Sequence, residues 1–253
     1  MDPTAEALVQ QGDTAWKCRS DRAALDEAIS AWERAVALDP HDAVTLTKLA
    51  RAHYFVSDAW PATLDFMERG VSYAERALSA ASPRFAEHRD ARMIEARTTE
   101  VEAAFWFATS LTKWSRKKGL LAVIGNLPRA NAVMRRLAEL DTDEAFGPSG
   151  IVYGAVDRFF GGYLSGAPRF AGRDLEKARR HFEKSIRRAP YFAGTRRLYA
   201  VDWAVKRRDR ALFERLLNEV LALPDGDAHD LGPETRLEKR KAAELLAEAD
   251  ALF

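Results

Sequence analysis

Apolar residues recur along this chain at the spacing of α-helices, and no stretch shows the sustained alternation of apolar and polar positions that favours strands. Ala, Leu, Glu, Arg and Lys dominate, and these residues are good helix formers. Pro and Gly mark the breaks, because Pro cannot continue a helix interior and Gly favours helix C-termini. We expect helices near residues 4–18, 22–38, 42–56, 61–80, 84–118, 127–139, 148–166, 174–188, 191–206, 209–222 and 233–252.

Two of these helices carry the same pattern of small and bulky residues. Ala28, Trp32, Ala35 and Pro40 follow the spacing A-x3-F-x2-A-x4-P, and the spacing returns at Ala178, Phe182, Ser185 and Pro190. This is the second half of a tetratricopeptide repeat, in which a bulky residue sits between small ones so that two helices pack closely. Chance in Ala-rich helices is the alternative. The two repeats are not contiguous, so we predict an all-α fold of irregular tetratricopeptide-like helix pairs, stacked into one superhelical domain over residues 1–253.

The segment 92–118 contains the consecutive aromatic residues Phe105, Trp106 and Phe107. Three successive residues point around more than half of a helix, so this helix must be covered on several sides. One interpretation is a central buried helix. The other is that Trp106, Thr109 or Trp114 lines a cavity for an apolar or amphipathic ligand.

The segment 147–172 holds 7 of the 14 glycines. Gly150, Gly154, Gly162 and Gly166 are spaced by multiples of four, which predicts one glycine stripe on a helix. Such a stripe indicates close approach of another helix or of a ligand. The aromatic residues Phe159 and Tyr163 lie beside it, and Arg158 and Arg169 are the cations placed to meet a ligand carboxylate if this face lines a pocket.

The net charge of +1 hides a strong local imbalance. Residues 1–50 have a net charge of −4 and residues 211–253 one of −5, whereas residues 169–210 hold 14 bases and 5 acids. A solvated face is one interpretation of this basic stretch, and binding of an anion or an acidic partner is the other. No nucleic-acid-binding motif accompanies the charge, so we expect no nucleic-acid partner.

The chain carries no recognisable catalytic or metal-binding motif. The single cysteine, Cys18, excludes an intramolecular disulfide and a CxxC site, and the five histidines form no H-x3-H or HExxH pair. We therefore expect no enzyme activity, no cofactor and no metal. An unrecognised enzyme would need titratable residues such as Asp157, His181 and Asp202 to converge in one pocket. The first residues have no basic n-region or apolar h-region, so they predict no signal peptide.

Three blocks of the chain resemble the T-component of TRAP transporters, the tetratricopeptide-like proteins of tripartite ATP-independent periplasmic transporters. The blocks are AFWFATSLTKWSR at 104–116, the glycine–aromatic segment with PRFAGRDLEKARRHFEKSI up to RALFERLLNEVL at 154–223, and KRKAAELLAEADALF at 239–253. The resemblance covers most of the chain from about residue 25 onward.

The resemblance implies a non-enzymatic protein that works beside a periplasmic substrate-binding protein. It further implies a bacterial protein that is either periplasmic or membrane-anchored through a segment absent from this chain, and oligomers with a pore or cavity. The job would be to hold or pass a small hydrophobic or carboxylate ligand.

On this interpretation eight residues are candidates for ligand binding, namely Trp106, Trp114, Arg158, Phe159, Tyr163, Arg169, Arg196 and Tyr199. They would line a groove bounded by the helices 92–118 and 148–166. The alternative function is a generic tetratricopeptide adaptor that binds a peptide or protein in its concave groove.

Overall fold

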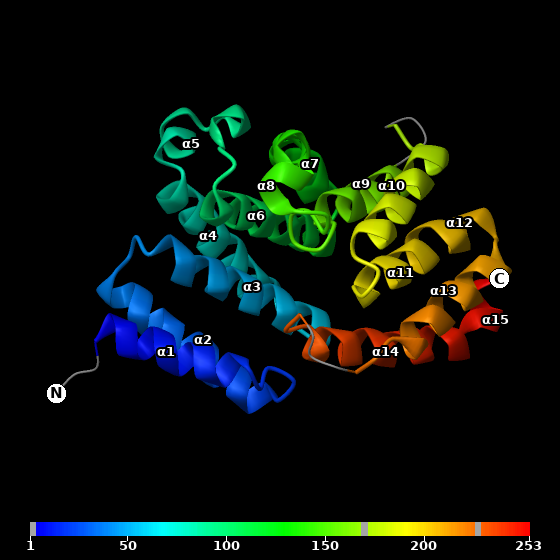
Figure 1. The fold of residues 1–253 in the computed structure, drawn as a ribbon, viewed down its shortest axis with the longest axis horizontal. Helices are drawn as coiled ribbons and strands as arrows, with labels where there is room; N and C mark the ends of the chain where they lie inside the picture. Colours follow the sequence, from blue (N-terminus) through cyan, green and yellow to red (C-terminus); the bar gives the residue numbers. More distant parts are fainter. Residues whose placement is uncertain (1–3, 168–171, 226–228) are drawn as a thin grey trace. The chain divides into compact units, whose positions relative to one another are not determined.

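A computed structural model describes residues 4–167, 172–225 and 229–253. These residues are helical and contain no strand, which confirms the predicted all-α class. The chain divides into two compact units, residues 1–140 and 141–253, shown together in Figure 1. Each unit is a set of packed helices in its own right. The expectation of one domain over residues 1–253 stays a prediction.

Unit 1 is built from long helices that pack in sequence as pairs. In chain order they are α1 (Ala5–Trp16), α2 (Arg22–Leu38), α3 (Ala43–Ala59), α4 (Leu64–Ala81), α5 (Pro83–His88), the 3-10 turn η1 (Ala91–Met93), α6 (Thr98–Lys118) and α7 (Leu120–Leu140). The side chains of Thr4, Asp21, Asp42 and Thr63 cap the N-termini of the first four helices. Helix α1 packs on α2, α3 on α4, and α6 on both α4 and α7.

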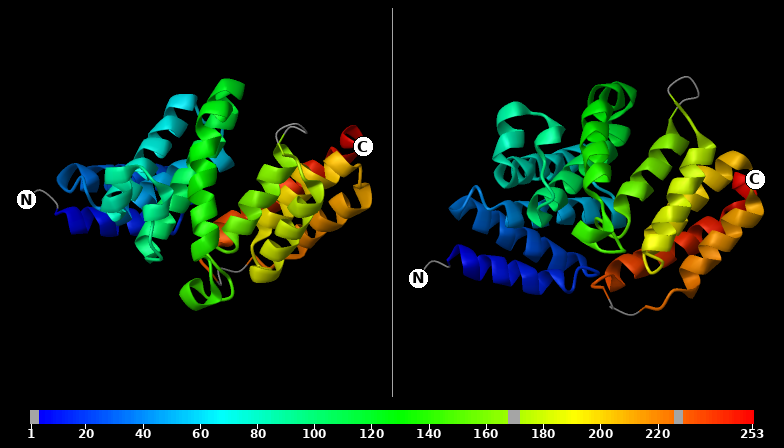
Figure 2. Two further views of the ribbon diagram at one scale, coloured as in Figure 1. Left: turned by 90° about the horizontal axis from the view of Figure 1, so that it is seen from above. Right: turned by 45° about the horizontal axis from the view of Figure 1, so that its top comes forward.

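Unit 2 contains shorter helices around a second core. They are α8 (Asp143–Phe146), α9 (Ala155–Gly166), α10 (Leu175–Arg188), α11 (Ala193–Tyr199), the π-helical turn η3 (Ala200–Ala204), α12 (Val205–Arg207), α13 (Arg210–Ala222), α14 (Gly232–Ala247) and α15 (Ala249–Leu252). Both views in Figure 2 show α9 beside α10 and α13 beside α14, and these are the closest helix pairs of the unit. The core between them includes Phe182, Trp203 and Phe213.

The repeat pattern marks two real helix pairs. Trp32 is buried on α2, and a Cβ on Gly12 of α1 would clash with its indole ring. Phe182 is buried on α10, and a Cβ on Gly161 of α9 would lie 2.8 Å from its phenyl ring. In both pairs a glycine of the first helix lets the aromatic wedge of the second helix approach its backbone.

The predicted helix over 84–118 is wrong, because the chain leaves the helix at Arg89. Arg89 adopts a left-handed conformation with φ of 53°, and the 3-10 turn η1 follows before α6 begins at Thr98. The interpretation of the segment 92–118 as a buried helix is confirmed for Thr98–Lys118 alone, where Phe105 and Phe107 are both buried. Helix α7 starts at Leu120, earlier than residue 127, and continues through Pro128.

The predicted glycine stripe is also wrong. Gly150 and Gly154 precede α9 and have positive φ values of 64° and 68°, so they shape a turn instead of a helix face. The chain from Val152 to Gly154 has positive φ at three successive residues. Helix α9 therefore begins at Ala155 and not near residue 148.

Candidate functional site

The structure distributes the predicted ligand-binding residues over both units. Trp106 and Trp114 lie on α6 in unit 1. On α9 and α11 in unit 2 lie Arg158, Phe159, Tyr163, Arg196 and Tyr199. Arg169 lies outside the described residues. The groove predicted between the helices 92–118 and 148–166 involves one helix from each unit, and it stays a prediction.

The two tryptophans of α6 pack within unit 1. The ring of Trp106 is half-buried and meets Tyr54 edge-on, with 5.5 Å between ring centroids. Trp114 is buried, and the Lys118 ammonium lies 4.3 Å from the centroid of its ring. Both side chains therefore contribute to the packing of α6.

Arg158 braces the left-handed turn that precedes its own helix. Its guanidinium donates hydrogen bonds to the Tyr153 carbonyl at 2.9 Å, to the Val152 carbonyl at 3.4 Å and to Thr195 Oγ1 at 3.3 Å. The same group lies 4.2 Å from the centroid of the Phe192 ring. These contacts show a structural task for the arginine that the sequence suggested as a carboxylate ligand.

Arg196 and Tyr199 are also held by their own unit. Arg196 pairs with Glu219 at 3.0 Å and donates to the Pro190 carbonyl at 2.6 Å. Tyr199 is stacked on Phe182 in the core, and its burial, together with the charge of Glu183, raises its pKa to about 12. By contrast, Phe159 and Tyr163 stack in parallel on α9, at 6.3 Å between centroids, with both rings half-buried.

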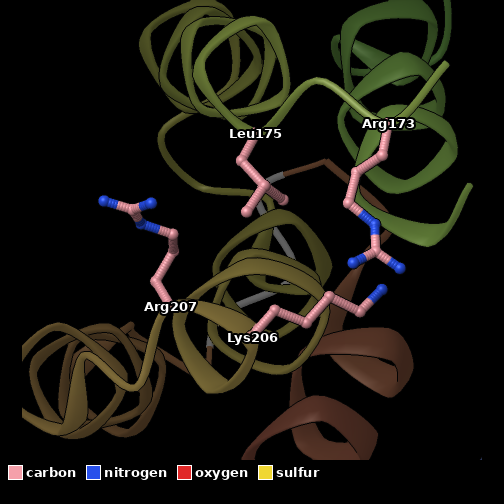
Figure 3. Close-up of a pocket in the computed structure, with 4 residues that line it drawn as sticks. All are labelled: Arg173, Leu175, Lys206 and Arg207. Atoms are coloured by element: carbon pink, nitrogen blue, oxygen red, sulfur yellow. The ribbon is translucent and has the colours of Figure 1, made fainter. Parts of the chain in front are cut away.

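A pocket of about 480 Å³ in unit 2 lies between the start of α10 and α12. Its described lining consists of Arg173, Leu175, Lys206 and Arg207, and Figure 3 shows the three basic side chains around Leu175. Among these lining residues none is acidic. The pocket is therefore a concentration of positive charge at the surface of the unit.

Hydrogen bonds to backbone carbonyls fix the shape of this pocket. Trp203 of η3 donates its indole N–H to the Leu175 carbonyl at 2.7 Å, which ties the start of α10 to the π-helical turn. Arg173 donates to the Ala167 carbonyl at 2.8 Å, and Lys206 donates to the Ser165 carbonyl at 2.6 Å. Ser165 lies in the last turn of α9 and Ala167 follows the helix directly, so two of the cations close that end of the helix.

The chemistry of the pocket suits a carboxylate or another anion. The cations of Arg173 and Lys206 bond to neutral carbonyls in these contacts, and Arg207 lies 5.8 Å from the Trp203 ring centroid. A carboxylate entering here would meet charge-assisted donors. The sequence showed these residues only as members of the basic stretch 169–210, because their convergence depends on tertiary contacts such as the Trp203–Leu175 hydrogen bond.

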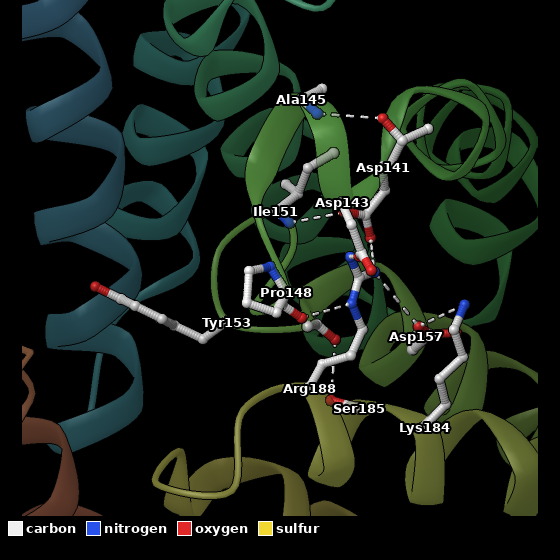
Figure 4. A network of polar contacts seen from close by, with 12 residues as sticks. Asp141, Asp143, Ala145, Pro148, Ile151, Tyr153, Asp157, Lys184, Ser185 and Arg188 are labelled. Carbon is white, nitrogen blue, oxygen red and sulfur yellow. Dashed lines mark hydrogen bonds and ion pairs between the residues drawn. The ribbon is translucent and has the colours of Figure 1, made fainter.

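A second polar cluster, drawn in Figure 4, joins α10 to α9 and to the segment before α9. Its centre, Arg188 with Asp141 and Asp157, is nearly buried, whereas Asp143 and Lys184 are exposed. Arg188 donates to Asp141 at 2.6 Å, to Asp143 at 3.2 Å and to the Pro148 carbonyl at 3.2 Å. Its guanidinium also comes within 4.0 Å of Asp157, whose other contacts are His181 at 2.9 Å and Lys184 at 3.2 Å. Burial alone would raise the pKa of Asp157, but the hydrogen bond from His181 and the charge of Lys184 hold it below its usual value.

This cluster only partly matches the arrangement that an unrecognised enzyme would need. Asp157 and His181 do meet, but the Asp202 carboxylate approaches α9 at Gly162, five residues further along and so about 140° around the helix. Among the described residues, no group of three or more His, Cys, Asp or Glu side chains is placed to hold a metal ion. The cluster acts as an internal ion-pair network of unit 2.

Comparison with known protein families gives a match. A family model described as "TRAP transporter T-component" matches residues 62–253, which begins later in the chain than the resemblance suggested by the sequence. No curated protein matches the chain. In the described part of the chain, no helix combines the length and the apolar character needed to cross a membrane.

Proposed function

This chain belongs to the TRAP transporter T-component family, and from that premise we propose that its cationic pocket docks the substrate-binding protein of the same transporter. Membership makes the chain a component of a TRAP transporter that works with the transporter's other parts. The family is not an enzyme family. The proposal places the docking event in the periplasm.

The observation that carries the proposal is the convergence of Arg173, Lys206 and Arg207 around one pocket. Other cations of the basic stretch are engaged inside unit 2, for example Arg158 under the left-handed turn and Arg188 in the buried network. The three pocket cations lie on exposed residues, where Arg173 and Lys206 also donate to carbonyls at the C-terminal end of α9. An acidic surface on the partner would therefore find its complement here, and electrostatic complementarity of this kind speeds association and favours the correct partner.

The pocket also supports a ligand-binding role of the same site. Its volume of about 480 Å³ lies within the range of ligand sites, roughly 300–1,000 Å³. Phe159 and Tyr163 lie in the C-terminal half of α9, and the carbonyls of Ser165 and Ala167 at the end of this helix hold Lys206 and Arg173. We propose these rings as the apolar part of a site for a small amphipathic carboxylate, with the three cations as its polar part.

Binding of the purified substrate-binding protein to the immobilised chain tests the docking proposal. The triple variant R173A/K206A/R207A should bind about tenfold more weakly, mainly through slower association, and should lose most of the salt dependence. The matched control is K17A/R34A/R135A, which removes three exposed cations from unit 1 and lowers the net charge by the same amount.

The two triple variants distinguish a specific role of the pocket from an effect of net charge. Equal weakening by both triple variants would show that only net charge matters, and the pocket would lose its role. If the unmodified chain fails to bind the substrate-binding protein at low salt, docking itself is wrong and the generic adaptor becomes the better interpretation.

A further inference from the structure

The first turns of α7 expose the most accessible large apolar side chains in the described part of the chain. Leu120, Leu121 and Ile124 are 70%, 85% and 63% exposed. We call Arg116 to Ile124 the α6–α7 tip. Single exposed leucines are ordinary on protein surfaces, but three within five residues form a patch that calls for a partner.

The three side chains share one face of α7. At 100° per residue, Leu121 and Ile124 lie about 100° and 40° around the helix from Leu120, so one surface can cover all three. Gly119, with φ of 120°, makes the turn, and a Cβ there would meet nothing within 4 Å. A Cβ at Gly125, inside α7, would also meet nothing within 4 Å. The apolar face is therefore open to whatever approaches the tip.

Positive charge surrounds this patch. Arg116, Lys117 and Lys118 form the last turn of α6, directly before the exposed leucines, and all three are exposed. Among the described residues they make no ion pair, and Lys118 lies over the Trp114 ring. No Asp or Glu occurs between Glu102 and Glu139. Of the seven Lys and Arg residues in this stretch, Lys113, Arg129 and Arg136 pair with carboxylates, so Arg116–Lys118 supply the charge beside the patch. The partner of the tip must accordingly be anionic as well as apolar.

We propose that the α6–α7 tip inserts into the surface of an anionic lipid bilayer. Apolar side chains next to a basic cluster are the combination that binds membrane interfaces, where the side chains enter the acyl boundary and the cations meet lipid phosphates. The apolar stretch from Leu120 to Ile124 is far shorter than the ~20 residues that span a bilayer, so the contact is interfacial. The site is distinct from the pocket of unit 2.

A second copy of the chain or another protein fits this patch less well. A two-fold contact would bring Arg116–Lys118 against the same residues of the copy, and like charges would repel. Three aliphatic side chains also supply only a fraction of the ~800 Å² per partner that a stable protein interface buries. A bilayer needs no such area.

Co-sedimentation with vesicles tests the proposal. The chain should bind vesicles that mix phosphatidylglycerol with phosphatidylcholine and bind vesicles of phosphatidylcholine alone at least tenfold more weakly. The variant L120Q/L121Q/I124Q should lose at least tenfold in partitioning to the mixed vesicles. The variant R116Q/K117Q/K118Q should lose the preference for phosphatidylglycerol.

A matched control is available in the same unit. Leu38, Val44 and Leu64 are exposed apolar residues elsewhere in unit 1, so L38Q/V44Q/L64Q removes the same kind of side chain and should bind like the unmodified chain. Thermal unfolding of each variant checks that the fold is retained. No binding of the unmodified chain to the mixed vesicles, or unchanged binding by L120Q/L121Q/I124Q, overturns the proposal. So does an oligomer that this variant converts to monomers while vesicles remain unbound.

Discussion

The helix pairs α1/α2 and α9/α10 share a glycine–aromatic contact but differ in the polar side chains beside it. In each pair a glycine of the first helix lies against an aromatic ring of the second, Gly12 on Trp32 and Gly161 on Phe182. In α1/α2 the accompanying carboxylate, Asp13, is 44% exposed and binds the Trp32 indole and Lys48. In α9/α10 the carboxylate Asp157 is only 5% exposed at its side chain and belongs to the Arg188 network.

This difference shows that cations of one basic stretch can have different roles. Some pair with carboxylates inside the fold, and others lie at the surface where a partner can reach them. Arg188 looks like one more charge of the basic stretch, yet its side chain is 11% exposed and reaches back to Asp141 in the segment before α9. The cations of the α10–α12 pocket, by contrast, lie on exposed residues. The recurring aromatic wedge gives both helix pairs the same packing. The polar groups around it determine which charged side chains pair internally and which remain exposed.

Breaking the buried network should produce the largest loss of stability. Arg188→Met removes the guanidinium and leaves Asp141, whose side chain is 3% exposed, without its cation. A buried charge left unpaired is costly, so the free energy of unfolding of unit 2 should fall by about 3 kcal/mol. Urea unfolding read by hydrogen exchange of unit 2 peptides measures this loss.

Two controls keep this result specific to the network. Arg187→Met alters an exposed neighbour on α10 and should change the free energy of unfolding very little. Lys48→Met breaks the half-exposed pair with Asp13 in unit 1 and should cost about 1 kcal/mol or less. Adding Asp141→Asn to Arg188→Met should recover part of the loss. If Arg188→Met costs no more than Arg187→Met, the contrast between the two pairs disappears.

The shared glycine–aromatic contact predicts a smaller effect that is similar in both units. Gly12→Ala and Gly161→Ala would each place a Cβ within 3 Å of a buried ring. Overpacking costs about 1–3 kcal/mol, against which Ala gains up to about 1 kcal/mol of helix propensity. A net loss of about 1 kcal/mol in each variant is expected from thermal unfolding.

Gly125 of α7 supplies the matched control for both substitutions. A Cβ at this position would meet nothing within 4 Å, so Gly125→Ala should stabilise the chain slightly. A stabilising effect of Gly12→Ala or Gly161→Ala would show that the corresponding pair has room for the extra methyl group, and the two wedges would then not be equivalent.

The fold was more predictable than the site because the repeat pattern is local and the polar contacts are not. Trp32 and Phe182 were identified as wedges from spacing alone, and both are buried. The break after α5 depends on the left-handed conformation of Arg89, which no glycine or proline announces. The glycine stripe failed because Gly150 and Gly154 have positive φ and lie outside the helix.

The roles of the site residues were also hard to predict from the sequence, because their contacts are not local. Arg158 has carbonyl partners in a turn whose conformation the sequence did not reveal, and Arg188 pairs with carboxylates more than forty residues upstream. The pocket cations Arg173 and Lys206 meet only because α12 lies beside the start of α10. Charge counts located the basic region, but tertiary packing decides which of its cations remain at the surface.

The smallest predicted difference between the units is their response to acid. Burial lowers the pKa of His53 on α3 below 6.5, although its hydrogen bond to the Leu49 carbonyl and the charge of Glu33 oppose the shift. The unfolded chain therefore binds this proton more readily than the folded one. The resulting contribution to stability is complete above pH 6.5 and declines as the pH falls toward the folded pKa, by at most about 1.4 kcal/mol per pH unit.

His53→Phe should remove this decline while keeping a ring to stack on Phe66, which lies 4.4 Å away between centroids. Urea midpoints followed by tryptophan fluorescence between pH 8 and pH 5 test this, because five of the six tryptophans lie in residues 1–140. Asp157→Asn is the comparison from unit 2. The pKa of Asp157 is lowered from 3.8, so its contribution is lost only below about pH 4, and within the tested range this variant should keep the slope of the unmodified chain. A slope that survives His53→Phe would assign the acid sensitivity of unit 1 to another group.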